Sequence, residues 1–211
     1  MTLEDIISFY NNTIKNIENE AIVAENYGGC LRSNKGALVE NIARLLIQLI
    51  CEELGFNDIV IDSKKEKIAY NEDSFYNFSI DIQVKYNNIL LLPIECKTYC
   101  DISMFKRVLY DANIARDFQN VKKSFLLQLE DSMNNKGVGS NIIYSKSTQF
   151  LYDYERNNIC QILTLLDGQR NSHRPINKIE YFKELSYNTI YDVKETLKKA
   201  LKEAYDRVIS R

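Results

Sequence analysis

The chain has 211 residues, a length that predicts one domain with a substantial core, because domains usually hold about 100 to 200 residues. Hydrophobic residues make up 45% and charged residues 27%, with 7 Gly and 2 Pro, which excludes disordered, collagen-like and low-complexity chains. Lys and Arg total 27 against 29 Asp and Glu, a net charge of −2, so any contact with nucleic acid has to rest on a local basic surface.

The chain's cysteine and histidine content excludes several kinds of site. No two cysteines stand in a CxxC pair, which argues against a disulfide framework and a thiolate zinc site: Cys30, Cys51, Cys96, Cys100 and Cys160. The single histidine, His173, excludes chemistry that needs two, such as HNH-type nucleases and HExxH metalloproteases. The longest strongly apolar run, 89–94, is far shorter than the ~20 residues of a membrane helix, and the first residues do not look like a signal peptide. We therefore expect a soluble cytoplasmic protein.

Helical spacing of apolar residues dominates the first quarter of the chain. It predicts an amphipathic helix over 3–25 and a second helix over 35–54 that is apolar on more than one side and therefore largely buried. The glycines of 27–36 predict a loop between them, with Ser33 or Asn34 as a helix cap. Gly55 is placed to end the second helix.

The period then changes from helix to strand. A short strand is predicted over 59–61, and 76–86 alternates as one strand with Phe78, Ile80, Ile82 and Val84 on a single face. A further strand over 89–97 forms a hairpin with it. The remaining elements, in chain order, are a helix over 102–121, a strand over 125–129, a loop over 134–141, a strand over 159–166, a basic loop over 167–178 and a helix over 188–211. This order predicts a single α/β domain over 1–211.

The predicted hairpin carries the residues most suited to chemistry. Strand side chains alternate, so Glu95 and Lys97 share a face. A two-residue turn at Asn87-Asn88 would put Asp81 on the other face, opposite Ile94. A three-residue loop, 86–88, with Asn88 in the left-handed conformation, puts Asp81 opposite Pro93 and diagonal to Glu95, and this is the register we expect.

Two carboxylates and an ammonium at one point suit metal-assisted hydrolysis of a phosphodiester. Mg²⁺ takes oxygen ligands and keeps several waters, so Asp81, Glu95 and the backbone carbonyl of Cys96 would suffice to hold it. The ion lowers the pKa of a bound water and neutralises phosphate charge. Lys97 could orient that water and stabilise the transition state. Glu40, inside the second predicted helix, could contact a metal-bound water or hold Lys97.

These residues resemble the PD-(D/E)xK nuclease superfamily and, within it, the type II restriction endonucleases. The resemblance rests on a helix with Glu40, a strand with Asp81, the strand segment PIECK with Glu95 and Lys97, and a following helix with Met104, Lys106 and Arg107. Ile80 stands where the motif name has proline. The resemblance implies a central mixed β-sheet flanked by helices, a catalytic core at about 36–130, Mg²⁺-dependent cleavage of double-stranded DNA, a homodimer, and a DNA methyltransferase that protects the host.

Plainer interpretations stay open for the same residues. An Asp followed by Glu-x-Lys arises by chance in many proteins, and Glu and Lys on one strand face often form a solvated ion pair. The context favours a nuclease, because the charges follow an apolar run that predicts a central strand. For Glu40, a salt bridge to Arg44 at i, i+4 is as plausible as a direct role. Cys96 is expected to be a core residue whose carbonyl matters.

The basic loop is the best candidate for reading DNA, within a recognition part at about 134–183. It holds side chains that suit base edges and phosphates: Gln169, Arg170, Asn171, His173 and Arg174. Lys106 and Arg107 could contact the DNA backbone beside the cut. An ordinary solvated loop and helix face are the alternatives. Two other functions remain possible: a structure-specific or repair nuclease of the same fold, and a non-catalytic DNA-binding or interaction module.

Overall fold

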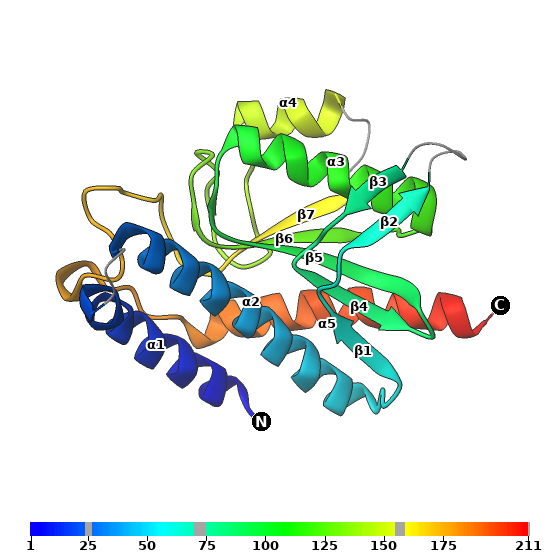
Figure 1. Ribbon diagram of the computed structural model, residues 1–211, viewed down its shortest axis with the longest axis horizontal. Helices are drawn as coiled ribbons and strands as arrows, with labels where there is room; N and C mark the ends of the chain where they lie inside the picture. The colour runs from blue at the N-terminus through cyan, green and yellow to red at the C-terminus, as the bar shows by residue number, and fades with distance from the viewer. Residues whose placement is uncertain (24–26, 70–74, 155–158, 211) are drawn as a thin grey trace.

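The computed structural model describes residues 1–23, 27–69, 75–154 and 159–210, which form a mixed five-stranded sheet between two layers of helices (Figure 1). The strands are β1 (Ile59–Asp62), β4 (Ile82–Tyr86), β5 (Ile89–Cys100), β6 (Ser124–Asp131) and β7 (Cys160–Thr164), in the spatial order β1-β4-β5-β6-β7. β1, β4 and β5 are antiparallel, whereas β5, β6 and β7 are parallel. The predicted α/β class with a central mixed sheet flanked by helices is confirmed.

Helices cover both faces of the sheet. α1 (Leu3–Val23), α2 (Tyr27–Leu54) and α5 (Tyr187–Ile209) lie on one face and share the largest hydrophobic cluster with alternate residues of β4, β5 and β6. α3 (Ile102–Gln119) and α4 (Lys146–Tyr154) lie on the other face, where Phe105, Leu126 and Ile162 belong to a second cluster. A short 3-10 turn, Ile179–Tyr181, precedes α5. No described helix is long and apolar enough to cross a membrane.

The predicted loop over 27–36 is wrong. α2 begins at Tyr27, so Ser33 and Asn34 lie inside the helix and neither caps it. Glycine costs about 1 kcal/mol in a helix interior, a weak preference that tertiary packing readily overrides. The long buried stripe that follows, with Leu38, Ile42 and Leu46 fully buried, provides that packing. Adding residues to an existing helix also avoids the cost of nucleation.

The end of α2 follows the sequence prediction. Gly55 adopts a left-handed conformation with φ of 69°. Its N–H donates to the carbonyl of Glu52 at 3.3 Å, and the Phe56 N–H donates to the carbonyl of Cys51 at 2.9 Å. This pair of bonds is the Schellman arrangement, which satisfies carbonyls that a helix end would otherwise leave open.

The prediction of one strand over 76–86 is also wrong. The chain leaves β3 (Phe75–Phe78) at Ser79 and enters β4 at Ile82, and these strands belong to different sheets. β3 pairs with β2 (Glu66–Ala69), a strand that the sequence analysis does not predict. Phe78 and Ile80 pack in a third cluster beside α3, whereas Ile82 and Val84 pack in the main core. Period-two alternation correctly predicted that the four apolar residues are buried, but neither the burial of Gln83 nor which core each apolar residue enters.

The β4–β5 turn differs from the expected three-residue loop. It is a two-residue turn in which Asn87 and Asn88 both have positive φ, 48° and 62°, as a type I′ hairpin turn requires. A β-bulge lies between Val84, which pairs with Leu92, and Lys85, which pairs with Leu90. The bulge shifts the register by one residue beyond it, so Pro93 pairs with Gln83 and not with Asp81.

The sequence analysis predicts no helix at α4, where only Thr148, Leu151 and Tyr152 on the inner side are buried. The other expected elements are present with ends shifted by a few residues, and β7 is shorter than the predicted 159–166. Residues 24–25 of the first predicted helix lie outside the described residues. The four cysteines whose side chains are described are free, and Cys30 is not among them.

Glu53 at the end of α2 ties this helix to α5. Its carboxylate accepts from Lys194 Nζ at 2.7 Å and from Lys198 Nζ at 2.6 Å. These two lysines hold the pKa of Glu53 below its ordinary value of 4.5. Lys194 is the more buried of the two lysines, with 8% of its side chain exposed. The pair therefore joins the two helices that cover the same face of the sheet.

We expect Glu53→Gln to lower the free energy of unfolding by about 1 kcal/mol at pH 7, because Lys194 then loses a charged partner across the helix interface. Because folding lowers the pKa of Glu53, its ionised carboxylate stabilises the folded state above the ordinary carboxyl pKa, and this stabilisation is lost as the pH falls through the lowered pKa. The difference from wild type should therefore shrink as the pH falls below 4.5, which urea unfolding at several pH values measures. Glu52→Gln, at a carboxylate with 61% of its side chain exposed, is the matched control; equal effects of the two would contradict the assignment.

Candidate active site

The bulge in the hairpin brings Asp81 beside β5. Ile82 pairs with Ile94, so Asp81, the residue before Ile82, lies next to Glu95. The Asp81 carboxylate accepts a hydrogen bond from the backbone N–H of Cys96 at 2.8 Å. Asp81 is thus anchored to the β5 backbone between Glu95 and Lys97. The three residues meet as predicted, although through a register different from the one we expected.

Lys97 joins the two carboxylates. Its Nζ lies 2.5 Å from Glu95 Oε1 and 3.4 Å from Asp81 Oδ2, and it donates to the carbonyl of Cys96 at 3.2 Å. All three charged side chains are partly buried, with 16% of Glu95, 28% of Asp81 and 31% of Lys97 exposed. The ammonium therefore offsets carboxylate repulsion in a site that is only partly open to water.

Burial and neighbouring charges shift the pKa values of Glu95 and Lys97. Burial raises the pKa of Glu95, and the Asp81 carboxylate raises it further, against the opposing effect of Lys97. Burial alone would lower the pKa of Lys97, but Glu95 and Asp81 together raise it above its ordinary value. The folded protein thus keeps Lys97 charged, whereas the surroundings of Glu95 disfavour its ionised form.

The second oxygen of Glu95 has no protein partner. Oε2 is buried and accepts no hydrogen bond, whereas Oε1 contacts Lys97. A buried carboxylate oxygen without a partner costs free energy, and such groups in native proteins often mark the place of an ion or water. The donors available are Oε2, the Asp81 carboxylate and the Cys96 carbonyl, all oxygens of the kind that Mg²⁺ prefers. These oxygens would leave several of the six positions around Mg²⁺ to water. Across the described residues, no three His, Cys, Asp or Glu side chains group as a metal site.

A cleft of about 370 Å³ opens over these groups. Its lining comes from the break after β3, from β5 and from the first turns of α3: Ser79, Asp81, Glu95, Lys97, Met104, Arg107 and Val108. Asp101 begins α3 as its N-cap, with its side chain accepting from the Met104 N–H at 2.8 Å, which fixes the start of the helix beside the cleft. The exposed Arg107 contributes a cation to the lining, while Lys106 is exposed but does not line it.

Glu40 lies near the cluster from α2. Burial and the Asp81 carboxylate raise its pKa, while Arg44 and Lys97 oppose the rise. The Glu40 carboxylate forms no ion pair within 4 Å with any described residue, so the alternative of a salt bridge to Arg44 has no direct contact to support it.

Cys96 has its thiol in the main core, as expected, and burial raises the pKa of that thiol.

A buried carboxylate that the sequence reading did not single out borders the site. Asp111 of α3 accepts a short hydrogen bond from the hydroxyl of Tyr76 in β3. Burial raises the pKa of Asp111, and the charge of Asp111 contributes to the raised pKa of Glu95. The contact docks the β2–β3 hairpin on α3 and so fixes the wall of the cleft that contains Ser79. The sequence offers one sign of this position: Asp111 follows Arg107 by four residues, about one turn of the predicted helix.

The basic loop over 167–178 is less free than its sequence suggests. The Gln169 side chain donates to the carbonyl of Asn135 at 2.7 Å and accepts from the Asn134 N–H at 3.2 Å. Asn171 Oδ1 accepts from the His173 N–H at 2.9 Å. Gln169 and Asn171 therefore have structural roles in the loop. Arg170, His173 and Arg174 are exposed.

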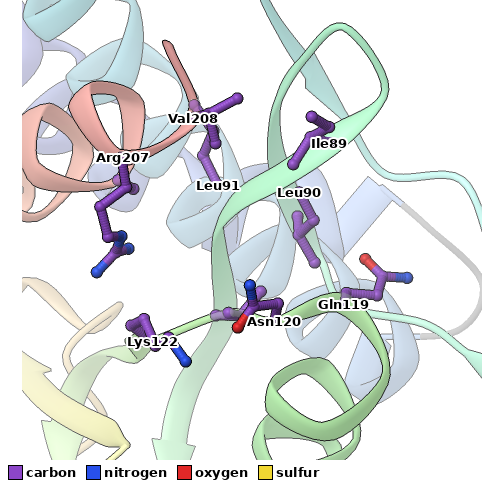
Figure 2. A pocket seen from close by; sticks show the side chains of 10 residues that line it. Ile89, Leu90, Leu91, Gln119, Asn120, Lys122, Arg207 and Val208 are labelled. Atoms are coloured by element: carbon purple, nitrogen blue, oxygen red, sulfur yellow. The ribbon is translucent and has the colours of Figure 1, made fainter. Parts of the chain in front are cut away.

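A second hollow, of about 60 Å³, lies at the opposite end of β5 (Figure 2). The turn end of the hairpin, the end of α3 and the last turns of α5 line it, with Ile89, Asn120, Lys122 and Arg207 among the residues. Its lining contains no carboxylate, and its size suits a few water molecules. It offers none of the groups that the chemistry of the first cleft requires.

No family model matches the chain. One curated protein, "Type II restriction enzyme DdeI" of Desulfomicrobium norvegicum, is 32% identical over 213 aligned positions, which cover 87% of this chain and 89% of that protein. A solved structure described as the native BbvCI A2B2 tetramer at low resolution aligns with a TM-score of 0.40 and 11% identity over 93% of this chain and 86% of its own. The first likeness spans both the hairpin and the basic loop.

We expect Lys97→Met to lower the free energy of unfolding by about 2 kcal/mol in buffer with a chelator, because two partly buried carboxylates lose their shared cation. Adding Glu95→Gln to that variant should recover part of the loss, since one of the repelling charges is then gone. Urea unfolding measures both. Lys106→Met, at an exposed lysine of α3, is the control and should stay within about 0.5 kcal/mol of wild type. A Lys97→Met protein as stable as wild type would show that the ion pairs contribute nothing.

Proposed function

We propose that this chain, which belongs to the family of the type II restriction enzyme DdeI, cuts both strands of DNA at a specific sequence through Asp81, Glu95 and Lys97 with Mg²⁺ as its metal. An identity of 32% along nearly nine-tenths of both chains makes the protein a restriction endonuclease, a site-specific deoxyribonuclease. The identity of the metal, the roles of the three residues and membership of the PD-(D/E)xK superfamily are what we propose beyond that assignment.

One observation carries the assignment of the site. In the cleft, the buried Glu95 Oε2 has no partner, and the Asp81 carboxylate, from the residue before β4, shares Lys97 with the other oxygen of Glu95. Asp81, Glu95 and the Cys96 carbonyl would hold Mg²⁺ by hard oxygen ligands. When bound, the ion supplies a nucleophilic water at neutral pH and neutralises charge on the phosphate.

The protein's own groups would then position the reactants. Lys97 Nζ, kept charged by Glu95 and Asp81, orients the attacking water and stabilises the charge that develops on the phosphate oxygens. The Cys96 N–H fixes the Asp81 carboxylate, so this group needs no rearrangement before reaction. Glu40 would act on a water beside the cluster, since its charged neighbours are Asp81 and Lys97 as well as Arg44.

Contacts to DNA would come from two places. Arg107, in the lining of the cleft, and the adjacent Lys106 would hold the backbone beside the cut. The exposed tip of the basic loop, with Asn171, His173 and Arg174, would reach base edges. Gln169 would act indirectly, because its side chain holds residues 134 and 135 in place.

A protein that makes both cuts of a double-strand break generally presents two sites, so we propose action as a homodimer. A DNA methyltransferase that modifies the same sequence would be its functional partner in the cytoplasm. The recognition sequence and the overhang follow from digestion of a mixed-sequence genome with purified protein and Mg²⁺, followed by sequencing of the ends. Ends without a shared sequence would favour a structure-specific or repair nuclease, and the absence of cleavage would favour a non-catalytic binding module.

We expect Asp81→Ala, Glu95→Ala and Lys97→Ala each to reduce plasmid cleavage by a factor of at least about 1,000 while DNA binding changes little, because these groups act mainly on the transition state. Glu40→Gln should have a milder effect. Cleavage rates in Mg²⁺ and binding by fluorescence anisotropy in Ca²⁺ separate the two steps. Full activity of any of the three alanine variants would remove that residue from the site.

The proposed ligand set also predicts which metals support cleavage. All its donors are oxygens, so Mg²⁺ and Mn²⁺ should both support cutting, and EDTA should abolish it. Ca²⁺ should support binding but little cleavage, because its looser coordination misplaces the water. The measurement is a single-turnover rate with each metal on the same plasmid. Equal rates with Ca²⁺ and Mg²⁺ would contradict this ligand set.

A further inference from the structure

Two exposed lysines lie in the short turn that leads from β1 to β2. They are Lys64 and Lys65, within residues 63–65. Among the side chains that the structure describes, no carboxylate lies within 4 Å of either ammonium group. Asp62, the acid that ends β1, is paired instead with Lys85 at 3.5 Å. The two positive charges of the turn are therefore open to a ligand of opposite charge.

The turn lies at the end of the sheet that holds the catalytic cluster. β1 and β4 pair antiparallel, with Asp62 opposite Gln83, so β1 ends beside the start of β4. Asp81 stands two residues before Gln83, which keeps their Cα atoms within about 7.6 Å of each other. Continued by two residues, the register of β1 and β4 would bring Lys64 level with Asp81. The turn is thus the neighbour of the cluster on its β1 side.

Gln83 ties the turn to the face of the sheet that carries Glu95. Ile82 pairs with Ile94, and both neighbours of Gln83 in β4, like both neighbours of Glu95 in β5, pack in the main core. Because strand side chains alternate, Gln83 and Glu95 share the face opposite that core. From this face the Gln83 Nε2 donates to the carbonyl of Lys64 at 2.9 Å. The bond that holds the turn is therefore made on the same side of the sheet as the cluster.

The backbone of the turn is fixed before any ligand binds. The Asp62 carboxylate accepts from the N–H groups of Ser63 at 2.7 Å and of Lys64 at 3.0 Å, and Gln83 holds the Lys64 carbonyl. Gln83 is fully buried, and its Oε1 has no protein partner. A buried amide with one unsatisfied end is costly, so its retention calls for a role. Holding the turn is the role that its bond to Lys64 shows.

A further cation reaches the cluster from another element. Arg107 lines the cleft from α3, and α3 packs in the second hydrophobic cluster with residues of β6 and β7. The cluster thus meets Arg107 from α3 and the two lysines from the β1 edge of the sheet. With a net charge of −2, the chain has to bind DNA through such a local basic surface.

We propose that Lys64 and Lys65 bind the phosphate backbone of DNA on the β1 side of the active site, and that Gln83 is a positioning residue that holds their turn. This inference rests on the proposed nuclease function. The bond that is cut lies in the sugar-phosphate backbone, so DNA that reaches the cluster brings neighbouring phosphates of the same strand with it. An ammonium binds phosphate as a point charge and reads no base edge. The two lysines therefore contribute affinity for every sequence.

The test measures binding to two duplexes, one of mixed sequence and one containing the cleavage site, in Ca²⁺ at several salt concentrations. The double variant Lys64→Gln/Lys65→Gln should weaken both by the same factor, roughly tenfold or more, because two phosphate contacts are lost. The slope of log affinity against log salt should fall by about 1.8, which is about 0.9 for each lost contact.

Lys199→Gln/Lys202→Gln is the control for the loss of two positive charges. Both lysines are exposed on α5, which covers the opposite face of the sheet (Figure 1). This control should leave the affinity and the salt slope unchanged. Wild-type binding by the Lys64→Gln/Lys65→Gln protein would overturn the proposal, and so would a loss confined to the duplex with the cleavage site, which would show that the lysines read bases. Either result, with wild-type protein that still cuts DNA, leaves the nuclease function intact; absence of cleavage by wild type would refute the function itself.

The role of Gln83 is tested by coupling. Gln83→Met removes the bond to the Lys64 carbonyl but keeps both charges, so it should weaken binding less than the double lysine variant does. Replacing both lysines in the Gln83→Met background should then cost a smaller factor in affinity than in wild type, because residues that act together are not additive. An equal cost in the two backgrounds would show that Gln83 does not position the turn for DNA.

Discussion

The hydrogen bond from the Cys96 N–H to the Asp81 carboxylate is the interaction on which the site depends. It exists because a bulge after a two-residue Asn-Asn turn shifts β4 by one residue against β5. Without that shift Asp81 would face the opposite side of the sheet from Glu95, since one residue of slip reverses every side chain of a strand. A single local irregularity therefore decides whether the two carboxylates can act on one ion.

The same arrangement is costly for the fold. Glu95 is mostly buried, lies beside another carboxylate, and has one oxygen without a partner. Lys97 compensates part of this cost, and the rigid surroundings hold the groups together: the apolar row of β5 beneath them, α3 capped by Asp101, and the Tyr76–Asp111 contact at the wall. Functional sites commonly retain such unfavourable groups because a ligand or a reaction uses them.

The sequence sufficed to predict the central sheet, the helices α1, α2, α3 and α5 that flank it, and the three residues of the cluster, because buried strands and long helices leave strong periodic patterns and Glu-x-Lys on a strand fixes a shared face. It misplaced what depends on tertiary context. The glycines at 28, 29 and 36 predicted a loop where packing extends α2, and the alternation of 76–86 concealed a change of sheet at Ser79. The Arg170 guanidinium lies over the ring of Tyr99, 71 positions earlier in the chain, and no local sequence pattern predicts this contact.

The central claim is that Asp81 and Glu95 together hold a divalent cation beside Lys97. Anomalous diffraction from a crystal of the protein grown with Mn²⁺ tests it most directly, because the signal locates the ion without assuming its ligands. The account predicts an anomalous peak in contact with an oxygen of Asp81 and with Glu95 Oε2, the buried atom that has no protein partner. A crystal with a bound Mn²⁺ elsewhere, and none between these two carboxylates, would contradict it.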